Sequence, residues 1–286
     1  MRLLVVSGRS GSGKSTALHV LEDEGFYCID NMPAALLMPL IEQMRQDNSD
    51  VLQRVAVSID ARNSSRDLTL LPQILHDIRA SNIECEVIYL DARKSTLIKR
   101  FSETRRKHPL SDYATNLSTA IAAEKKLLEP IANLASLTID TSNLTLYQLR
   151  DTVLNRVARP THVGLSLLFL SFGYKHGIPV DADIVFDVRC LTNPYWKPEL
   201  RGLTGLAPLV QDFLAADPRV RSMLDDIRVY LEKWLPAFHQ QRRYMTVAIG
   251  CTGGQHRSVY ISAMLQCYFN AEYKNTQLRH RELSLP

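Results

Sequence analysis

Residues 8 to 15 of this chain have the residue types and the spacing of a phosphate-binding loop. They read Gly-Arg-Ser-Gly-Ser-Gly-Lys-Ser, a glycine followed after four residues by Gly-Lys-Ser. A glycine-rich turn at the start of a helix directs several backbone N–H groups, and the positive end of the helix dipole, at one anion. The lysine of this motif reaches the β- and γ-phosphates, and the serine contacts Mg²⁺. The sequence therefore predicts binding of a nucleoside triphosphate, ATP or GTP, by Gly8, Arg9, Ser10, Gly11, Ser12, Gly13, Lys14 and Ser15.

The metal ion of such a site needs an acidic contact, usually an aspartate at the end of a neighbouring strand. Three aspartates directly follow apolar runs, and these are Asp30, Asp60 and Asp91. The carboxyl ends of parallel strands meet at the edge of the sheet where the phosphate loop lies. We expect Ser15 and either Asp60 or Asp91 to contact Mg²⁺, and at least one of the three aspartates to cap a helix or lie in a loop.

A second glycine-rich loop follows an apolar run at 244–250 and precedes a predicted helix at 258–270. It predicts a second anion site. Its Cys-x5-Arg-Ser spacing is also that of phosphatases in which a cysteine thiolate attacks phosphate. Gly250 stands where those enzymes usually have a histidine, so we favour a pocket for a phosphorylated ligand over a phosphatase or a structural turn. The residues of this pocket are Cys251, Thr252, Gly253, Gly254, His256 and Arg257.

A basic stretch at residues 99–107 contains Arg100, Arg105 and Arg106. Small-molecule kinases place arginines on a mobile lid, where they meet the transferring phosphoryl group. A solvated basic helix face accounts for the same residues equally well.

The last part of the chain is basic. Residues 242–286 contain six arginines and lysines and two glutamates, which equals the net charge of +4 of the whole chain. Aromatic residues are interspersed among them, a pattern compatible with contacts to an RNA backbone as well as with a solvated surface. The candidate RNA contacts, together with a lysine in an earlier glycine-flanked loop, are Lys175, Lys274, Arg279 and Arg281.

The spacing of apolar runs predicts an α/β protein with two domains. In the first half, predicted strands alternate with helical patterns, which indicates a parallel sheet flanked by helices. A polar connector at 155–163 separates the halves, so we place the domains at 1–156 and 163–286. A helical region at 206–240 is expected to break at Pro218 and Pro236. The predicted strands lie at 3–7, 26–29, 55–59, 86–90 and 137–139, and then at 165–172, 184–188 and 244–250.

Composition excludes several classes of protein. No apolar run approaches the roughly 20 residues of a membrane span. The five cysteines are scattered, with no Cys-x-x-Cys pair, so neither a disulfide framework nor a structural zinc site is indicated. We expect a cytoplasmic protein.

Several motifs give the chain a near end-to-end resemblance to the RapZ family of RNase adapter proteins. They are residues 6–15, Gly25-Phe26-Tyr27-Cys28, Ser58-Ile59-Asp60-Ala61-Arg62-Asn63, His108-Pro109-Leu110, Phe172 to Pro179, Val185 to Arg189, and Val247 to Tyr260.

The resemblance implies an N-terminal P-loop kinase-like domain with weak ATPase and GTPase activity. It implies an ATP site at 8–15 and a GTP site at Asp60, Ala61, Arg62 and Asn63. It also implies a C-terminal domain that senses glucosamine-6-phosphate and binds small regulatory RNA, in an oligomer that presents RNA to an endoribonuclease. Gln255 and Tyr195 stand where enteric members have a lysine and a histidine, and the basic enteric terminus is missing.

Three hypotheses remain. The leading one is a nucleotide-binding protein that hydrolyses ATP or GTP slowly with Mg²⁺, senses a phosphorylated amino sugar and binds RNA. The first alternative is a small-molecule kinase that uses the lid arginines. The second is an RNA-binding adapter whose nucleotide site is vestigial.

Overall fold

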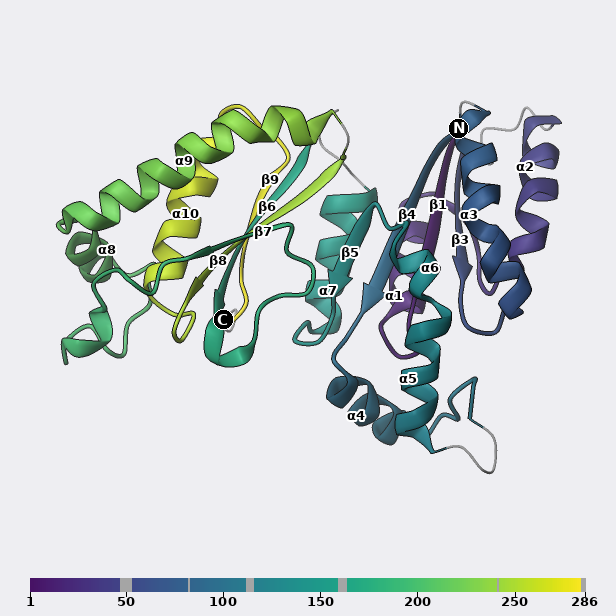
Figure 1. Ribbon diagram of the computed structural model, residues 1–286, viewed down its shortest axis with the longest axis horizontal. Coiled ribbons are helices and arrows are strands. Elements are labelled where there is room, and N and C mark those ends of the chain that lie inside the picture. The colour runs from purple at the N-terminus through teal and green to yellow at the C-terminus, as the bar shows by residue number, and fades with distance from the viewer. Residues whose placement is uncertain (47–52, 82, 112–115, 159–163, 241, 284–286) are drawn as a thin grey trace. The chain divides into compact units, whose positions relative to one another are not determined.

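Figure 1 shows the fold in a computed structural model that describes residues 1–46, 53–81, 83–111, 116–158, 164–240 and 242–283. The chain divides into two compact units, Met1–Arg159 and Pro160–Pro286. Each unit has its own parallel sheet, which confirms the predicted α/β class. Among the described residues, no helix is long and apolar enough to cross a membrane.

The first unit is built on a five-stranded parallel sheet with the strand order β2-β3-β1-β4-β5. This order places β1, which leads into the phosphate loop, at the centre between β3 and β4. Each strand lies where the sequence predicts one, although β4 begins at Glu84 rather than at residue 86. The strands are β1 (Arg2–Gly8), β2 (Tyr27–Ile29), β3 (Arg54–Ile59), β4 (Glu84–Asp91) and β5 (Leu137–Asp140).

Helices connect these strands and cover both faces of the sheet (Figure 1). The connector predicted at 155–163 is wrong in its first part, because Leu154–Ala158 form a π-helical turn that buries Arg156, Val157 and Ala158. The rest of that connector lies outside the described residues. The helices are α1 (Lys14–Asp23), α2 (Leu37–Gln46), α3 (Ser65–Ala80), α4 (Lys94–Thr104), α5 (Leu117–Leu127), α6 (Glu129–Ala132) and α7 (Leu146–Val153), with a 3₁₀ turn η1 (Ala34–Leu36) before α2.

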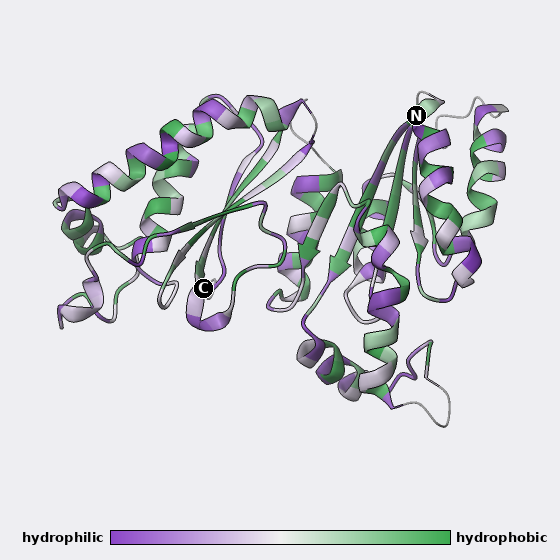
Figure 2. Cartoon of the chain, viewed as in Figure 1, coloured by the Kyte–Doolittle hydropathy of each residue, from purple (hydrophilic) through white to green (hydrophobic). Residues whose placement is uncertain are grey.

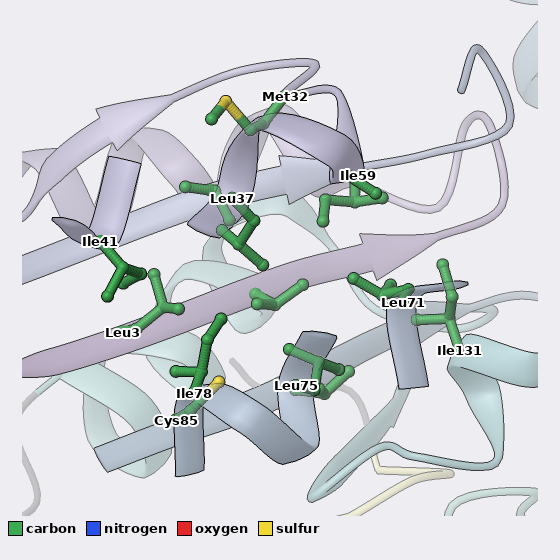
Figure 3. Close-up of a cluster of buried hydrophobic side chains, with 14 of the residues drawn as sticks. Leu3, Met32, Leu37, Ile41, Ile59, Leu71, Leu75, Ile78, Cys85 and Ile131 are labelled. Carbon is green, nitrogen blue, oxygen red and sulfur yellow. The ribbon is translucent and has the colours of Figure 1, made fainter. Parts of the chain in front are cut away.

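The strands β1, β3 and β4 are mostly apolar along their length (Figure 2), and nearly all of their residues are buried. One face packs against α2, α3 and α6, and Figure 3 shows the resulting cluster, in which Leu3 of β1 lies among side chains of these helices. On the helix side, Leu71, Leu75 and Ile78 of α3 are fully buried. A strand buried on both faces is typical of a parallel sheet between helical layers.

The second unit has a four-stranded parallel sheet in the order β7-β8-β6-β9. The sequence did not predict β9, because its residues, Thr-Gln-Leu-Arg-His, are mostly polar and it lies at an edge of the sheet. The strands are β6 (Ser166–Gly173), β7 (Ile184–Asp187), β8 (Tyr244–Cys251) and β9 (Thr276–His280), and the helices are α8 (Pro208–Ala215), α9 (Pro218–His239) and α10 (Arg257–Phe269), with short 3₁₀ turns η4 (Tyr174–His176) and η5 (Pro194–Trp196).

The three helices of this unit pack on one face of the sheet, where Phe169 of β6 contacts Phe269 of α10 with ring centroids 5.8 Å apart. The helical region does break before Pro218, as predicted. The predicted break at Pro236 is wrong, because α9 continues through that residue to His239. Leu231 and Leu235 of α9 are fully buried, and this packing outweighs the loss of one backbone hydrogen bond at the proline.

Candidate nucleotide and anion sites

The phosphate loop lies between β1 and α1, in the predicted strand–loop–helix context. Gly8, Gly11 and Gly13 all have positive φ angles, of 144°, 81° and 105°. A Cβ atom on Gly8 would lie 2.1 Å from the carbonyl oxygen of Leu90 in β4. Glycine is therefore required at the exit from β1, since any side chain would collide with the neighbouring strand.

Contacts from four other segments of this unit hold the phosphate loop in place. Arg9 Nε donates to Asp91 Oδ1 at 2.5 Å, and the N–H of Ser10 donates to the Glu124 carboxylate at 2.9 and 3.0 Å. The carbonyl of Gly11 accepts from Arg100 at 2.9 Å, and that of Ser12 accepts from the Thr141 hydroxyl at 2.9 Å. Successive loop residues are thus fixed by β4, α5, α4 and the segment after β5. A loop held in this way is ordered before a ligand arrives.

Most of the loop's backbone donors remain available to an anion. The N–H of Ser10 is taken by Glu124, and that of Ser12 donates to the Arg9 carbonyl at 3.0 Å. Within the described residues, the N–H groups of Gly11 and Gly13 donate to no protein acceptor. The first N–H groups of α1, from Lys14 onward, have no partner inside the helix. These donors and the helix dipole form an anion-binding cup.

Lys14 lies folded over this loop. Its Nζ donates to the carbonyls of Gly8 and Arg9, at 2.8 and 3.3 Å, and lies 3.9 Å from Asp60 Oδ2. Burial lowers the pKa of Lys14, while the charges of Asp60 and Glu124 oppose that shift. An arriving phosphate would offer the ammonium group a stronger partner than two neutral carbonyls.

Asp60 meets the requirements for the metal contact better than Asp91. Burial raises the pKa of Asp60, but hydrogen bonds from Arg62 and the charge of Lys14 outweigh it and lower the pKa, so the carboxylate is ionised beside the loop lysine. An anionic oxygen donor is what Mg²⁺ prefers. Ser15 is exposed at the first turn of α1, so its hydroxyl is accessible. Asp91, by contrast, accepts from Arg9 and from the N–H of Ala92, and so serves the loop's structure.

The remaining candidates of this unit have structural partners. Asp30 accepts from the Ser58 hydroxyl at 2.5 Å and from the N–H of Asn31 at 2.9 Å. Asn63 accepts the N–H of Ala34 at 2.7 Å and donates to the Met32 carbonyl at 3.2 Å, which fixes the segment after β2. Both ends of the Asn63 amide are therefore engaged by the protein's backbone.

The three arginines expected on a lid fall into two groups. Arg100 is anchored, since it donates to the Gly11 carbonyl and to both the hydroxyl and the carbonyl of Thr141. Arg105 and Arg106 are exposed at the end of α4, where Arg105 has a φ of 50° and terminates the helix. Only these last two have the freedom that a lid requires.

In the second unit, β8, the glycine-rich loop and α10 follow one another in the strand–loop–helix order on which the prediction of a second anion site depends. The sulfur of Cys251 accepts the N–H of Gly254 at 3.2 Å and lies 3.1 Å from the Ser258 hydroxyl. Arg257 is buried, with Nη1 donating to the carbonyls of Arg189 and Leu191 and Nη2 to the Thr252 hydroxyl.

Two polar atoms of this loop, Nε of Arg257 and Nε2 of His256, are buried and make no hydrogen bond of ordinary geometry in the described part of the chain, although the Cys251 sulfur interacts with the Arg257 guanidinium. Burial lowers the pKa of His256, so its ring is neutral, whereas the guanidinium remains charged. A buried donor left unpaired is costly, and an anion in the loop would satisfy it.

The cations expected to contact RNA are not equivalent. Lys175 and Lys274 are exposed. Arg279 pairs with Asp181 at 3.5 Å, and the Arg281 side chain is only 6% exposed, with Nη2 donating to the carbonyls of Gly173 and Gly177. Arg279 and Arg281 are engaged by groups of the protein itself, because β9 and the residue after it pair with β6; RNA contact by any of the four residues stays a prediction. Sequence reasoning also missed Glu124, which a basic or glycine-rich motif could not have revealed.

Comparison with known protein families and sequences gives matches along nearly the whole chain. Family models match as the RapZ-like N-terminal domain over residues 1–160 and as the RapZ C-terminal domain over residues 165–284. Relatives from Ectopseudomonas mendocina and Hahella chejuensis, each called a nucleotide-binding protein, are 57% identical over 285 residues, which is 99% of this chain and 100% of each relative.

Solved structures give only partial likenesses. The shikimate kinase from Acinetobacter baumannii in complex with shikimate has a TM-score of 0.36 and 16% identity, and the match covers 54% of this chain and 90% of that one. A gluconokinase from Sinorhizobium meliloti has a TM-score of 0.34 and 16% identity, over 53% of this chain and 88% of that one. Both TM-scores are below 0.5, and both matches cover only about half of this chain. The two domain matches and the near-full-length relatives show that the chain belongs to the RapZ family.

Proposed function

We propose that the first unit binds a nucleoside triphosphate with Mg²⁺ and hydrolyses it slowly. The observation that carries this proposal is the anion-binding cup. Glu124 and Arg100 fix its backbone, and Lys14 and Asp60 lie beside it. Lys14 would neutralise the phosphate charge, while Ser15 and Asp60 would hold the metal ion, which neutralises charge on the transferring phosphoryl group. The relatives' name, nucleotide-binding protein, supports the same function.

We further propose that ATP and GTP share this one site. Asp60 lies 3.9 Å from Lys14 and pairs with Arg62 at 2.8 Å, so the tetrapeptide 60–63 adjoins the phosphate loop. The Asn63 amide is held by two backbone groups, the N–H of Ala34 and the carbonyl of Met32, which favours a structural role over the reading of a separate guanine base. Residues 60–63 would then contribute metal and phosphate contacts for either nucleotide.

Calorimetric titration of the full chain with ATP and with GTP tests both statements. Lys14→Ala should weaken the binding of both nucleotides, by roughly tenfold or more, because it removes a charged phosphate contact. The exposed Lys94→Ala on α4 is the matched control and should bind as the wild type. The two nucleotides should compete at a stoichiometry of one. Simultaneous binding of ATP and GTP would contradict the shared site, and unchanged affinity in Lys14→Ala would contradict nucleotide binding by this loop.

For the second unit we propose sensing of a phosphorylated amino sugar, with glucosamine-6-phosphate as the candidate that family membership suggests. The unpartnered Arg257 Nε at the N-terminal end of α10 supports a phosphate contact there. Titration with glucosamine-6-phosphate, with glucosamine as control, should show binding of the phosphorylated sugar alone. Arg257→Met should abolish this binding, and equal binding of the two sugars would refute a phosphate site.

Family membership also supports a cytoplasmic RNase adapter role, with small RNA and an endoribonuclease as partners of a homo-oligomer. Lys175 and Lys274 are the exposed cations that could serve RNA binding. A gel shift with a structured small RNA should weaken steeply as salt rises. The rival function, a small-molecule kinase that uses Arg105 and Arg106, predicts stoichiometric transfer of radiolabelled phosphate to a metabolite, which the adapter role does not.

A further inference from the structure

One buried carboxylate next to the phosphate loop makes none of the contacts proposed for the nucleotide. The side chain of Glu124, on α5, is 0% exposed. Its oxygens accept the Ser10 N–H at 2.9 and 3.0 Å, and Oε1 accepts the Ser10 hydroxyl at 2.6 Å. An anionic side chain therefore accepts hydrogen bonds from the third residue of a loop that we propose to bind an anion.

His108 holds the other side of this carboxylate. Its Nε2 lies 3.1 Å from Glu124 Oε2, and its Nδ1 accepts the N–H of Leu110 at 3.1 Å. A backbone N–H can only donate, so Nδ1 is the unprotonated nitrogen and the proton on Nε2 is donated to Glu124. The ring is thus fixed in one tautomer, and it packs on Phe101 of α4 with centroids 5.1 Å apart.

Glu124 is ionised in these surroundings. Burial raises the pKa of its carboxyl group, but the hydrogen bonds from His108 and Ser10 outweigh burial and lower the pKa. The field of this carboxylate also acts on Lys14. A buried charge is retained only where it is fully hydrogen-bonded, and among the described residues every donor to Glu124 comes either from the loop or from His108.

We propose that Glu124 is a positioning residue of the phosphate loop and that His108 orients it, so that these two side chains set the loop's affinity for nucleotide. This inference rests on the proposed nucleotide binding. By accepting the N–H and hydroxyl of Ser10, the carboxylate fixes the backbone of the loop, so the other N–H groups of the loop stay available to a phosphate. The conformational entropy of ordering the loop is then lost on folding and not on nucleotide binding.

Glu124→Gln tests this role at almost unchanged side-chain volume. The glutamine amide replaces one of the two carboxylate oxygens by an NH₂ donor, so either the Ser10 hydroxyl on Oε1 or His108 Nε2 on Oε2 faces a donor instead of an acceptor. Calorimetric titration with a non-hydrolysable ATP analogue and Mg²⁺ should show roughly ten- to hundredfold weaker binding. Glu103→Gln, at an exposed glutamate of α4, is the matched control and should bind as the wild type.

Two variants of His108 distinguish its hydrogen bond to Glu124 from its packing in the interior. His108→Gln keeps an N–H that can donate to Glu124, whereas His108→Leu fills space without a donor. The affinity for the ATP analogue should fall in the order wild type, Gln, Leu. A merely structural role would lower the melting temperature without producing this order, and these variants serve if Glu124→Gln does not fold.

Hydrogen exchange of the nucleotide-free protein gives a readout that does not depend on ligand. The Ser10 amide should exchange faster in Glu124→Gln and in His108→Leu, while amides of β6 in the second unit remain unchanged. Wild-type affinity and wild-type Ser10 exchange in folded Glu124→Gln, or equal affinity of the two His108 variants, would overturn the proposal. If the ATP analogue did not bind even the wild type, that result would instead contradict the proposed function. Hydrogen exchange of the Ser10 amide would still test whether Glu124 holds Ser10.

Discussion

Replacing Asp60 by asparagine tests the proposed metal contact and separates it from the phosphate contacts. Asp60 is 5% exposed in its side chain, lies 3.9 Å from Lys14, and hydrogen-bonds Arg62. Asparagine keeps the size and one acceptor oxygen but removes the negative charge. We therefore expect the variant to keep its affinity for nucleotide without metal and to lose the gain in affinity that Mg²⁺ supplies.

The magnitude follows from charges at these distances. At an effective dielectric of about 20, the attraction between Asp60 and Lys14 is about 4 kcal/mol before the cost of desolvation. Its removal leaves two cations, Lys14 and Arg62, free to meet phosphates, so affinity in EDTA should stay equal or rise. Loss of a carboxylate that orients the metal should reduce the effect of Mg²⁺ by roughly ten- to hundredfold.

The assay is calorimetric titration of the full chain with ATP, once with excess Mg²⁺ and once with EDTA. Asp91→Asn is the control, because Asp91 pairs with Arg9, which is 7% exposed, rather than with Lys14. This control should cost about 1–3 kcal/mol of stability and preserve the ratio of the two affinities. A full Mg²⁺ effect in Asp60→Asn, together with its loss in Asp91→Asn, would refute our assignment.

Three further changes have defined outcomes. Gly8→Ala should destabilise the first unit by about 3 kcal/mol or more in urea unfolding, because its Cβ would lie 2.1 Å from the Leu90 carbonyl oxygen; Gly25→Ala, with open space around it, should cost less. Asn63→Ala should lower stability by about 1–3 kcal/mol, since the N–H of Ala34 loses its acceptor, but leave the preference between ATP and GTP unchanged; a changed preference would restore a base-reading role. Burial lowers the pKa of His280 from 6.5 to about 4, so between these values the unfolded chain binds a proton that the folded chain does not. Stability should therefore fall as pH falls through this window, and His280→Gln should flatten that fall in denaturation curves measured from pH 7 to pH 4.

The sequence alone determined the phosphate loop, the strand before it and the helix after it. These features depend on contiguous residues: an apolar run, glycines where φ is positive, and a lysine and a serine at the first turn of the helix. The glycine-rich loop after β8 was predicted for the same reason. The edge strand β9 was missed, because a mostly polar strand lacks the apolar signal that identifies the others.

Only the tertiary structure decided which charged groups act together. Asp60 follows β3 and Asp91 ends β4, and both strands neighbour β1, so spacing could not choose between the two aspartates. In the structure Arg9 contacts Asp91, and Lys14 lies beside Asp60. Glu124 reaches Ser10 across 114 positions of sequence, which no local pattern encodes. Backbone conformation is set by neighbouring residues, whereas the pairing of charges depends on strand order and on the helix packing that brings distant segments into contact.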